Sequence, residues 1–459
     1  MKPEFKKNTK EAEETTKDTD KKKSDLVDDE FFTEASLVTV KKDVAAKQEK
    51  RIYADIEEMI RQCRWDDALS LYYPVEEKLP ELLDQGMASR VREKMAFVLG
   101  QVKRFDEAIS ELKICVEADP ENFYTRSSLA YTAYNSLYAA KNREIMMPGH
   151  LKAERIKLAH ENFEKACEIR PEDVTCAYRN GMLYKQIENK IDRAGPFFEK
   201  AVANWEQLSA EDKEKRHQQR KNYIKALYQL AACRLEAGDL HRAMALIKQC
   251  LSEDEKSGHL SLVFKYFALG KILFNAGSFP EARDALLFAV KSGQADRQPI
   301  DFVYELLARN YLAMAYPERA REMIKLIPEN KRRPYVRWTE ADVHCALEQY
   351  DQARQVLKKS LDRDSRSKHK TLIKLARLEY GMADFEAVAA YAEQADRFFR
   401  EKWGNPCLDG LFWGAAAALR NGRKDRAVGL TEELQAHAPN YPKLKRLQRA
   451  ISDTWGENE

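Results

Sequence analysis

The sequence contains few of the residues that interrupt helices. Glycine occurs 17 times and proline 15 times in 459 residues. Ala, Leu, Glu, Lys, Arg and Gln, which all favour helices, dominate almost every window after residue 50. This composition predicts an all-α protein.

No apolar run is long enough to cross a membrane. The longest, LFWGAAAAL at 411–419, is far shorter than the ~20 residues that a spanning helix requires. The first residues, MKPEFKKNTK, are followed by acids rather than by an apolar stretch, which excludes a signal peptide or a membrane anchor there. The expectation is a cytoplasmic protein without a membrane span.

The charge shows no large excess of either sign. Lys and Arg number 78 against 75 Asp and Glu, for a formal net charge of +3. Basic stretches occur at 213–221, 330–338 and 366–370, and Tyr335 and Trp338 could stack on bases. Acids interrupt the basic residues throughout, so we expect no nucleic-acid partner. An RNA-binding repeat protein is kept as an alternative.

Cysteines at metal-binding or redox spacing are absent from the sequence. The eight cysteines lie far apart, with no C-x-x-C pair, and the histidines form no cluster at metal spacing. We therefore expect no metal site and no cofactor. The cysteines are predicted to be small apolar side chains between helices in a reducing compartment.

Catalytic motifs are also absent from the sequence. It contains no phosphate-binding loop, dinucleotide fingerprint, H-E-x-x-H or G-x-S-x-G motif. LGKIL at 269–273 has a Gly-Lys pair, but it lies in a predicted helix without the glycine loop that would present backbone N–H groups to phosphate. His160 and His344 are isolated on predicted helices. The sequence predicts no enzyme activity.

The stretch RFDEAISELKICVEADPEN at 104–122 shows what the sequence does contain. Its apolar residues follow three-four spacing and form one stripe of a helix: Phe105, Ala108, Ile109, Leu112, Cys115 and Val116. Asp119 and Pro120 then end the helix, since the residue before proline avoids the α region. A second stripe at 92–103 predicts two antiparallel helices over residues 89–118.

The same pattern recurs along the chain. In each unit a small or apolar anchor lies three residues after an aromatic or apolar residue, and further apolar residues follow four and seven or eight positions later. The anchors are Ala68, Ala108, Ala159, Ala194, Ala243, Ala282, Ala320, Ala353, Val388 and Ala427. Ten units between residues 49 and 440 predict a helical solenoid.

These units resemble tetratricopeptide repeats. The best match, LSLVFKYFALGKILFNAGSFPEARDALLFAV at 260–290, has the family's residues at Tyr266, Leu269, Gly270, Leu273, Gly277, Phe279, Ala282, Leu286 and Ala289. Three units also close with the family's proline, at Pro120, Pro171 and Pro439. The resemblance covers most of the chain and implies a right-handed superhelical solenoid of about ten helical hairpins.

Four segments follow from this assignment. Residues 1–45 are predicted to be a disordered charged tail, because 6–25 contain almost no apolar residue. Repeats at 46–222 include an insertion at 138–157 and a charged bridge at 204–222, and further repeats occupy 223–440. Residues 441–459 are predicted to form a capping helix and tail, since a solenoid must cover its last apolar face.

Two of these segments have alternative interpretations. The insertion at 138–157 is either a lengthened helix with a turn or a loop that reaches a partner. The short apolar stretch DDEFFTEASLVTV at 28–40 either packs on the first repeat or is a docking motif. The bridge is predicted to be a longer exposed helix.

The resemblance also implies where a partner would bind, because the first helices of such hairpins line the concave wall that carries the ligand. The residue after the position of Tyr266, together with neighbouring aromatic and basic residues, gives a candidate groove. It comprises Tyr53, Tyr131, Tyr134, Tyr178, Tyr228, Phe264, Phe267, Lys271, Phe274, Arg309, Trp338, Arg377 and Phe412. Aromatic rings with cations between them suit a peptide or amphipathic helix that carries apolar and acidic groups. The alternative is that these rings pack between helices.

The sequence therefore predicts a non-catalytic scaffold that binds a segment of a partner protein and supports assembly of a complex. The Lys/Asn carboxylate clamp of the family's chaperone-tail receptors has no match here, which argues against that role. A self-assembling structural component is kept as an alternative.

Overall fold

In the computed structural model, described for residues 34–455, every regular element is a helix. The ten hairpins are α1 (Glu34–Arg61) with α2 (Trp65–Tyr72), α5 (Ser89–Gln101) with α6 (Phe105–Ala118), α7 (Phe123–Lys141) with α8 (Gly149–Ile169), α9 (Val174–Met182) with α10 (Ile191–Glu206), α12 (His217–Glu236) with α13 (Leu240–Glu253), α14 (Leu262–Asn275) with α15 (Phe279–Ala295), α16 (Asp301–Ala313) with α17 (Pro317–Lys325), α18 (Pro334–Ala346) with α19 (Tyr350–Arg363), α20 (Lys368–Gly381) with α21 (Phe385–Trp403), and α22 (Leu408–Arg420) with α23 (Lys424–His437). The prediction of an all-α array of about ten hairpins is confirmed.

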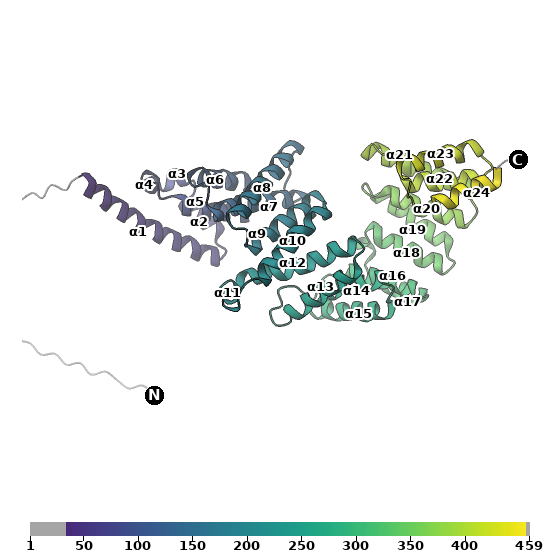
Figure 1. Ribbon diagram of the computed structural model, residues 1–459, viewed down its shortest axis with the longest axis horizontal. Coiled ribbons are helices and arrows are strands. Elements are labelled where there is room, and N and C mark those ends of the chain that lie inside the picture. The colour runs from purple at the N-terminus through teal and green to yellow at the C-terminus, as the bar shows by residue number, and fades with distance from the viewer. Residues whose placement is uncertain (1–33, 456–459) are drawn as a thin grey trace, which may run out of the picture. The chain divides into compact units, whose positions relative to one another are not determined.

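Six shorter or connecting elements complete the chain (Figure 1). They are α3 (Val75–Lys78), α4 (Pro80–Asp84), the π-helix η1 (Leu183–Glu188) that continues α9, α11 (Ala210–Lys215), the 3-10 turn η2 (Glu329–Lys331), and α24 (Leu444–Trp455). The segment predicted to cap the solenoid forms α24, which buries Leu444 and Leu447.

The chain divides into two compact units, Met1–Pro120 and Glu121–Glu459. The described part of the first unit holds α1 to α6, and the second holds α7 to α24. The boundary predicted near residue 45 falls inside α1, which begins at Glu34 and buries Ala45, Ile52 and Ile56. The boundary predicted at 222 falls inside α12. The predicted tail before Glu34 lies outside the described residues.

The small anchors explain how each hairpin closes. All ten have no solvent exposure: Ala68, Ala108, Ala159, Ala194, Ala243, Ala282, Ala320, Ala353, Val388 and Ala427. In some hairpins a glycine on the first helix lets a side chain of the second helix come close to its backbone. A Cβ on Gly270 would lie 2.7 Å from Cγ of Leu286, and one on Gly181 would lie 2.7 Å from Cε1 of Phe198. The helices of a hairpin therefore pack closely because one residue of each pair is small.

Helix ends follow the local chemistry of the chain. Helix α6 stops at Ala118, and Asp119 leaves the helical conformation before Pro120, as predicted. Side chains of Asn122, Asp173 and Asp384 accept backbone N–H groups at the starts of α7, α9 and α21. These caps satisfy donors that have no partner inside the helix.

The two segments of unusual length are built from helices. The insertion at 138–157 comprises the end of α7, a turn and the start of α8, which are 19 and 21 residues long. Met146, in the turn, is 96% exposed. The bridge at 204–222 contains the end of α10, the short α11 and the start of α12. It breaks at 207–209 and at Arg216, in place of the single long helix that was predicted.

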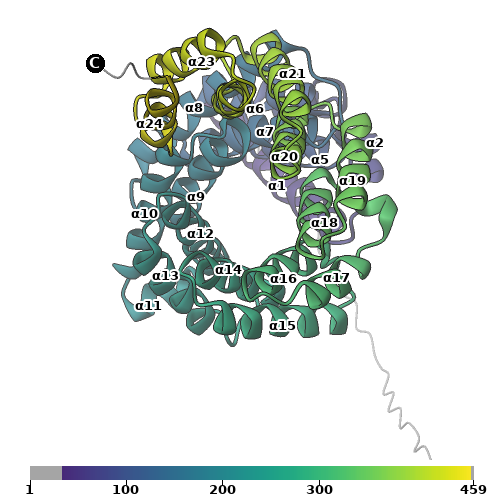
Figure 2. The same cartoon turned by 90° about the vertical axis from the view of Figure 1, so that its right-hand side faces the viewer.

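Within the second unit the two helices of each hairpin form two layers. Figure 2 shows α9, α12, α14, α16, α18 and α20 on the inside, with α13, α15, α17, α19 and α21 outside them. Each inner helix contacts the inner helix of the next hairpin, and the series continues from α20 to α22. We use the term inner face for one side of the inner helices, the side turned away from the outer helices. These helices are α9, α12, α14, α16, α18, α20 and α22.

A buried ion pair links two hairpins of the second unit. Lys265 Nζ lies 2.9 Å from Asp254 Oδ2, and both side chains are almost fully buried. Asp254 also accepts the backbone N–H groups of His259 and Leu260. Burial alone would raise the pKa of Asp254, but the hydrogen bonds from Lys265 and these N–H groups hold it below its ordinary value. The pair fixes the turn between α13 and α14.

Candidate functional site

A row of aromatic rings follows one side of α14. Phe264, Phe267, Lys271 and Phe274 are spaced by three, four and three residues, so they share one side of the helix. Phe264 stacks on Phe302 of α16, with ring centroids 5.8 Å apart and planes 6° apart. Phe267 meets the same ring edge-on at 4.7 Å. We call Phe264, Phe267, Lys271, Phe274, Phe302 and Arg309 the central stripe.

The central stripe combines exposed apolar surface with positive charge. Phe264 is 41% exposed, although aromatic side chains usually pack away from water. The guanidinium of Arg309 lies 5.1 Å from the centroid of the Phe274 ring. Lys271 is exposed, and its charge adds to burial in lowering the pKa of Lys185. The other three rings, Phe267, Phe274 and Phe302, are partly buried against the core. One exposed ring on this base, beside two cations, forms a surface that can hold an apolar group next to an acid.

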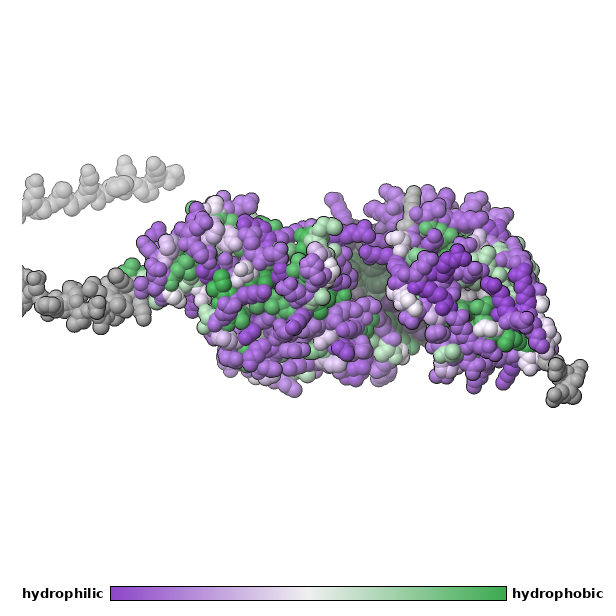
Figure 3. All heavy atoms as spheres, turned by 90° about the horizontal axis from the view of Figure 1, so that it is seen from above, coloured by the Kyte–Doolittle hydropathy of each residue, from purple (hydrophilic) through white to green (hydrophobic). Residues whose placement is uncertain are grey.

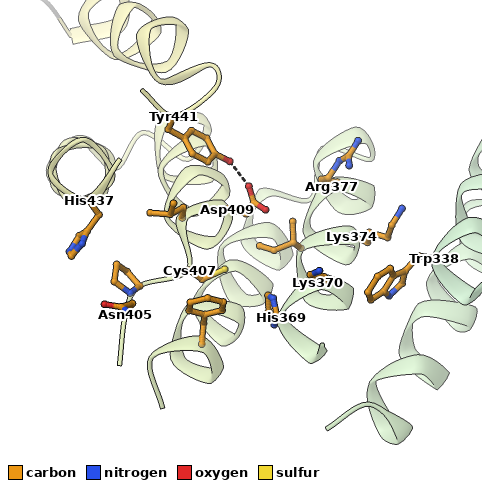
Figure 4. A pocket seen from close by; sticks show the side chains of 14 residues that line it. Trp338, His369, Lys370, Lys374, Arg377, Asn405, Cys407, Asp409, His437 and Tyr441 are labelled. Carbon is orange, nitrogen blue, oxygen red and sulfur yellow. Dashed lines mark hydrogen bonds between the residues drawn. The ribbon is translucent and has the colours of Figure 1, made fainter. Parts of the chain in front are cut away.

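A second candidate site lies further along the inner face (Figure 4). It is a cavity of about 700 Å³, which we call the C-terminal pocket. Helix α18 contributes Trp338, and the start of α22 contributes Leu408 and Asp409. Helix α20 contributes His369, Lys370, Ile373, Lys374 and Arg377. Phe399, residues 405–407, His437 and Tyr441 complete the wall.

Hydrogen bonds hold several of the pocket residues in place. Trp338 Nε1 donates to Thr371 Oγ1 at 2.8 Å, and Lys374 Nζ donates to both carboxylate oxygens of Asp342 at 2.6 Å. The hydroxyl of Tyr441 donates to Asp409, and burial together with this contact raises the pKa of Tyr441. The pocket therefore has a defined wall.

Lys370 and Arg377 differ from Lys374. Both side chains are exposed and line the pocket, and neither has an acidic partner among the described residues. The three cations occupy positions i, i+4 and i+7 on one side of α20. Two positive charges in the pocket are therefore available to a ligand.

His369 lies at the edge of the same pocket, between the cations and a group of aromatic rings. Its ring centroid is 5.0 Å from that of Phe399 and 5.3 Å from that of Trp403. Burial, with a contribution from Lys370, lowers the pKa of His369. Its Nδ1 atom is buried and has no hydrogen-bond partner in the described part of the chain. The neutral imidazole is therefore the favoured form.

The predicted groove residues near α7 and α9 lie in different surroundings. Tyr134 and Tyr178 are only 8% and 9% exposed. Tyr134 donates its hydroxyl to Gln186 Oε1 at 3.2 Å, and the guanidinium of Arg179 covers the ring of Tyr131 at 3.6 Å. These three rings offer little surface to a partner, and their part in binding stays a prediction.

The remaining predicted residues are distributed along the chain. Tyr53 belongs to α1 in the first unit and lies beneath Lys94, whose Nζ is 4.7 Å from its ring centroid. Burial raises the pKa of Tyr228 to about 12. Phe412 packs against Tyr441 with ring centroids 5.5 Å apart. The structure thus brings one set of predicted residues together in the central stripe and places Trp338 and Arg377 in the C-terminal pocket.

Sequence reasoning missed Phe302, Lys370 and Tyr441. Phe302 precedes Arg309 by seven residues, and Lys370 precedes Arg377 by seven, so each lies on the same side of its helix as a predicted residue. A search two helical turns before Arg309 and Arg377 would have identified Phe302 and Lys370. Tyr441 follows α23 and reaches Asp409 across 32 residues, and no local pattern indicates that contact.

The surface around the inner face has mixed character. Figure 3 shows hydrophobic residues within a hollow of the surface and hydrophilic residues around its rim. Within residues 34–455 there is no group of three or more His, Cys, Asp or Glu side chains that could hold a metal ion. No described helix is both long and apolar enough to cross a membrane.

Comparison with protein families supports the predicted repeat. Residues 225–257 match the model of the tetratricopeptide repeat family. The matched segment covers most of α12 and all of α13, including the anchor Ala243. This hairpin precedes the one at 260–290, whose residues fit the family pattern best. The prediction of tetratricopeptide repeats is confirmed. No curated protein matches the chain.

Several solved structures are similar at low identity. RapI in its apo form has a TM-score of 0.46 at 11% identity, over 87% of this chain and 99% of RapI. A tetratricopeptide repeat protein from Parabacteroides merdae has a TM-score of 0.44 at 15% identity, over 64% of this chain and 99% of that chain. PilF of Pseudomonas aeruginosa has a TM-score of 0.37 at 19% identity, over 54% of this chain and 99% of that chain. At these scores the likenesses carry no argument about function.

Proposed function

We propose that this tetratricopeptide-repeat chain is a protein-interaction scaffold that binds a segment of a partner protein on the inner face of its second unit. The observation that carries the proposal is the central stripe, in which Phe264 stays 41% exposed while it stacks on Phe302. An exposed ring held rigid by a neighbouring ring loses little entropy when a partner covers it. Such anchors are typical of the residues that dominate binding energy.

The geometry of the stripe supports an elongated ligand. From Phe264 to Phe274 the stripe covers ten residues of α14, which corresponds to about 15 Å along the helix. Arg309 and Lys271 place positive charge beside the rings. A peptide or an amphipathic helix that presents apolar side chains and some acids would complement this surface.

The proposed role is non-catalytic and uses no cofactor. The sequence holds no catalytic motif, and ten repeats occupy the chain from the start of α1 to the end of α23. The expected role is to support assembly of a multiprotein complex. A cytoplasmic location stays a prediction.

The test is affinity capture from a nuclease-treated native lysate with matched variants. Phe264→Ala removes a ring of the central stripe that is 41% exposed, and Phe288→Ala removes one of 42% exposure from the outer helix α15. A protein retained by the unmodified chain and by Phe288→Ala, but recovered about tenfold less with Phe264→Ala, would support the proposal. Equal recovery by all three would contradict it.

Two controls separate the alternatives. Light scattering over a range of concentrations detects self-association, which would favour the self-assembling component. Binding of single-stranded RNA that falls steeply as salt increases would favour the RNA-binding alternative. Either result, with no protein captured through Phe264, would replace the scaffold proposal.

A further inference from the structure

We propose that the C-terminal pocket selects the partner segment, by accepting two acidic side chains about three residues apart with an apolar side chain between them. This inference rests on the proposed function, because it names the chemistry of the segment that the inner face would bind. It concerns different residues from the central stripe, so the two proposals can fail separately.

The two available cations determine the spacing of the acids. Lys370 and Arg377 are seven residues apart on α20, which separates them by about 10 Å along the helix. A peptide in the polyproline II conformation rises about 3.1 Å per residue and repeats every three residues, so acids three residues apart span about the same distance on one side of the segment. Lys374 lies between them but already donates to both oxygens of Asp342. The pocket therefore offers two separate positive charges rather than a continuous basic surface.

Apolar side chains line the pocket beside those charges. Ile373 is halfway between Lys370 and Arg377 along α20, and it lines the cavity together with Leu408. The ring of Trp338 lines the same cavity (Figure 4). A volume of about 700 Å³ is within the usual range for sites that enclose ligands. An apolar side chain of the segment would fill this space and be removed from water.

The charges around the pocket favour a peptide over a nucleic acid. Asp409 lines the cavity, and Asp342 neutralises Lys374 at its edge. A phosphate backbone carries one negative charge per nucleotide and would lie against Asp409. Two acids separated by uncharged residues can reach the two cations without that repulsion.

The experiment measures fluorescence polarisation with a labelled ten-residue Gly/Ser peptide that carries two aspartates three positions apart and a leucine between them. The matched probe replaces both aspartates by asparagine. The protein variants are Lys370→Glu with Arg377→Glu, and a control with Lys248→Glu and Lys358→Glu on the outer helices α13 and α19. All four side chains are exposed and have no acidic partner among the described residues, so each pair changes the total charge equally.

We expect the acidic probe to bind the unmodified chain and the control at least tenfold more tightly than the asparagine probe. The Lys370→Glu, Arg377→Glu variant should lose this preference and bind a probe with lysines at the two positions. Circular dichroism should show the same helix content in all variants. Equal binding of the two probes to the unmodified chain would overturn the inference without any substitution.

The remaining outcomes also decide the question. A single-stranded oligonucleotide that binds more tightly than the acidic probe, and releases from the Lys370→Glu, Arg377→Glu variant, would replace the peptide by a nucleic acid. Probe binding that depends on Lys370 and Arg377, without any protein captured through Phe264, would support the pocket and contradict the wider scaffold proposal. Capture of a protein through Phe264, without a preference for the acidic probe, would support the scaffold proposal and contradict the inference about the pocket.

A different observation carries a second inference. Sγ of Cys167, near the end of α8, lies 3.1 Å from Sγ of Cys176 in the first turn of α9, and neither cysteine forms a disulfide. Cys167 is partly exposed, whereas Cys176 is buried. We infer that peroxide converts this pair to a disulfide that joins the two helices.

The chemistry of this step balances with peroxide as the oxidant. The Cys167 thiolate attacks one peroxide oxygen, the O–O bond breaks, and a sulfenic acid and one water form after proton transfer. The Cys176 sulfur then attacks Cys167, the S–S bond forms, the S–O bond breaks and a second water leaves. The hydrogen bond from Cys176 lowers the pKa of the Cys167 thiol, which favours the attacking thiolate.

The test treats the folded chain with hydrogen peroxide, then measures its intact mass and the alkylation of its thiols in denaturant, where buried cysteines also react. We expect a loss of two hydrogen atoms, loss of alkylation at Cys167 and Cys176 together, and reversal by dithiothreitol. Buried Cys115 and Cys250 serve as internal controls, and Cys176→Ser should abolish the mass change. Addition of oxygen at Cys167 without crosslinking in the unmodified chain would overturn the inference.

Discussion

Two helices of the inner face, α9 and α18, contain an aromatic residue at the same repeat position, but in different environments. Tyr178 of α9 is 9% exposed and packs against Phe198. Trp338 of α18 is half-buried and lines a cavity of about 700 Å³. The repeat position therefore does not decide whether its side chain packs between helices or faces a pocket.

Neighbouring cations differ in the same way. At the α9 end, Arg179 covers Tyr131, and burial lowers the pKa of Arg179. On α20, Lys370 and Arg377 are exposed and have no acidic partner among residues 34–455. A cation that lies on a ring closes the surface, whereas cations that extend past the ring leave it open to a ligand.

The largest expected contrast compares the two aromatic residues. Tyr178→Ala should lower the free energy of unfolding by about 4 kcal/mol, because it leaves a cavity among buried side chains. Trp338→Ala should lower it by about 2 kcal/mol, because half of the ring packs against the core cluster that contains Leu357 and Leu375 and because Thr371 loses a donor. It should also weaken partner binding by about 2 kcal/mol. Chemical denaturation and binding measurements on both variants test this. Equal destabilisation by the two substitutions would show that Trp338 is also part of the core.

The corresponding contrast for charges is between Lys265 and Lys370. Lys265→Met leaves the carboxylate of Asp254 buried without its partner, so we expect a loss of about 3 kcal/mol in the free energy of unfolding. Lys370→Met should change it by less than about 0.5 kcal/mol, because this side chain is exposed.

Because the pKa of Asp254 is lowered in the fold, the contribution of the pair should disappear as pH falls below the ordinary carboxyl range. Denaturation at neutral and acidic pH measures both effects, and an insensitive Lys265→Met variant would contradict them.

A smaller contrast concerns two helical glycines. Gly181→Ala would place a Cβ 2.7 Å from the fully buried ring of Phe198, and we expect a loss of about 1–3 kcal/mol. In Gly429→Ala of α23 the added Cβ has no atom within 4 Å outside the adjacent residues and the backbone of its own helix, so the substitution should stabilise the chain by about 0.5–1 kcal/mol. Thermal unfolding of the two variants should therefore shift in opposite directions.

The smallest expected effect is a pH dependence at the pocket. Burial lowers the pKa of His369 in the folded chain. Between this lowered pKa and the ordinary histidine pKa, the imidazole therefore binds a proton more readily in the unfolded chain than in the folded chain. The free energy of unfolding should therefore decrease as pH falls from about 7 through 6.5 toward the folded pKa. His369→Phe keeps an aromatic ring beside Phe399 and Trp403, and this part of the pH dependence should be absent from its denaturation curves. If the free energy of unfolding of His369→Phe depends on pH as in the unmodified chain, another group causes the dependence.

Much of the fold could be predicted from the sequence. The ten small or apolar anchors are all fully buried, and α6 ends at Ala118 before the Asp-Pro pair. Segments of unusual composition were harder to predict. The bridge at 204–222 breaks at Arg216, and α1 begins at Glu34, inside the stretch predicted to be a tail. Charge-rich windows do not show where a helix stops when it packs on a neighbour.

The candidate site could be predicted only in part. Phe264, Phe267, Phe274 and Arg309 come together in the central stripe as aromatic and basic residues of successive inner helices. The C-terminal pocket also needs Tyr441, the turn at 405–407 and His437, which are remote from α20 in sequence. Without those segments, nothing in the sequence separates Trp338 from Tyr178.

The sequence by itself determined the helices, the hairpins and the buried anchor of each repeat, because apolar spacing and helix-ending residues act within a few turns of the chain. Only the tertiary structure decided which inner rings are covered and which cations have partners. Those properties depend on side chains contributed by helices tens of residues apart, such as Thr371 to Trp338 and Asp342 to Lys374. Contacts of this range leave no periodic pattern in the sequence.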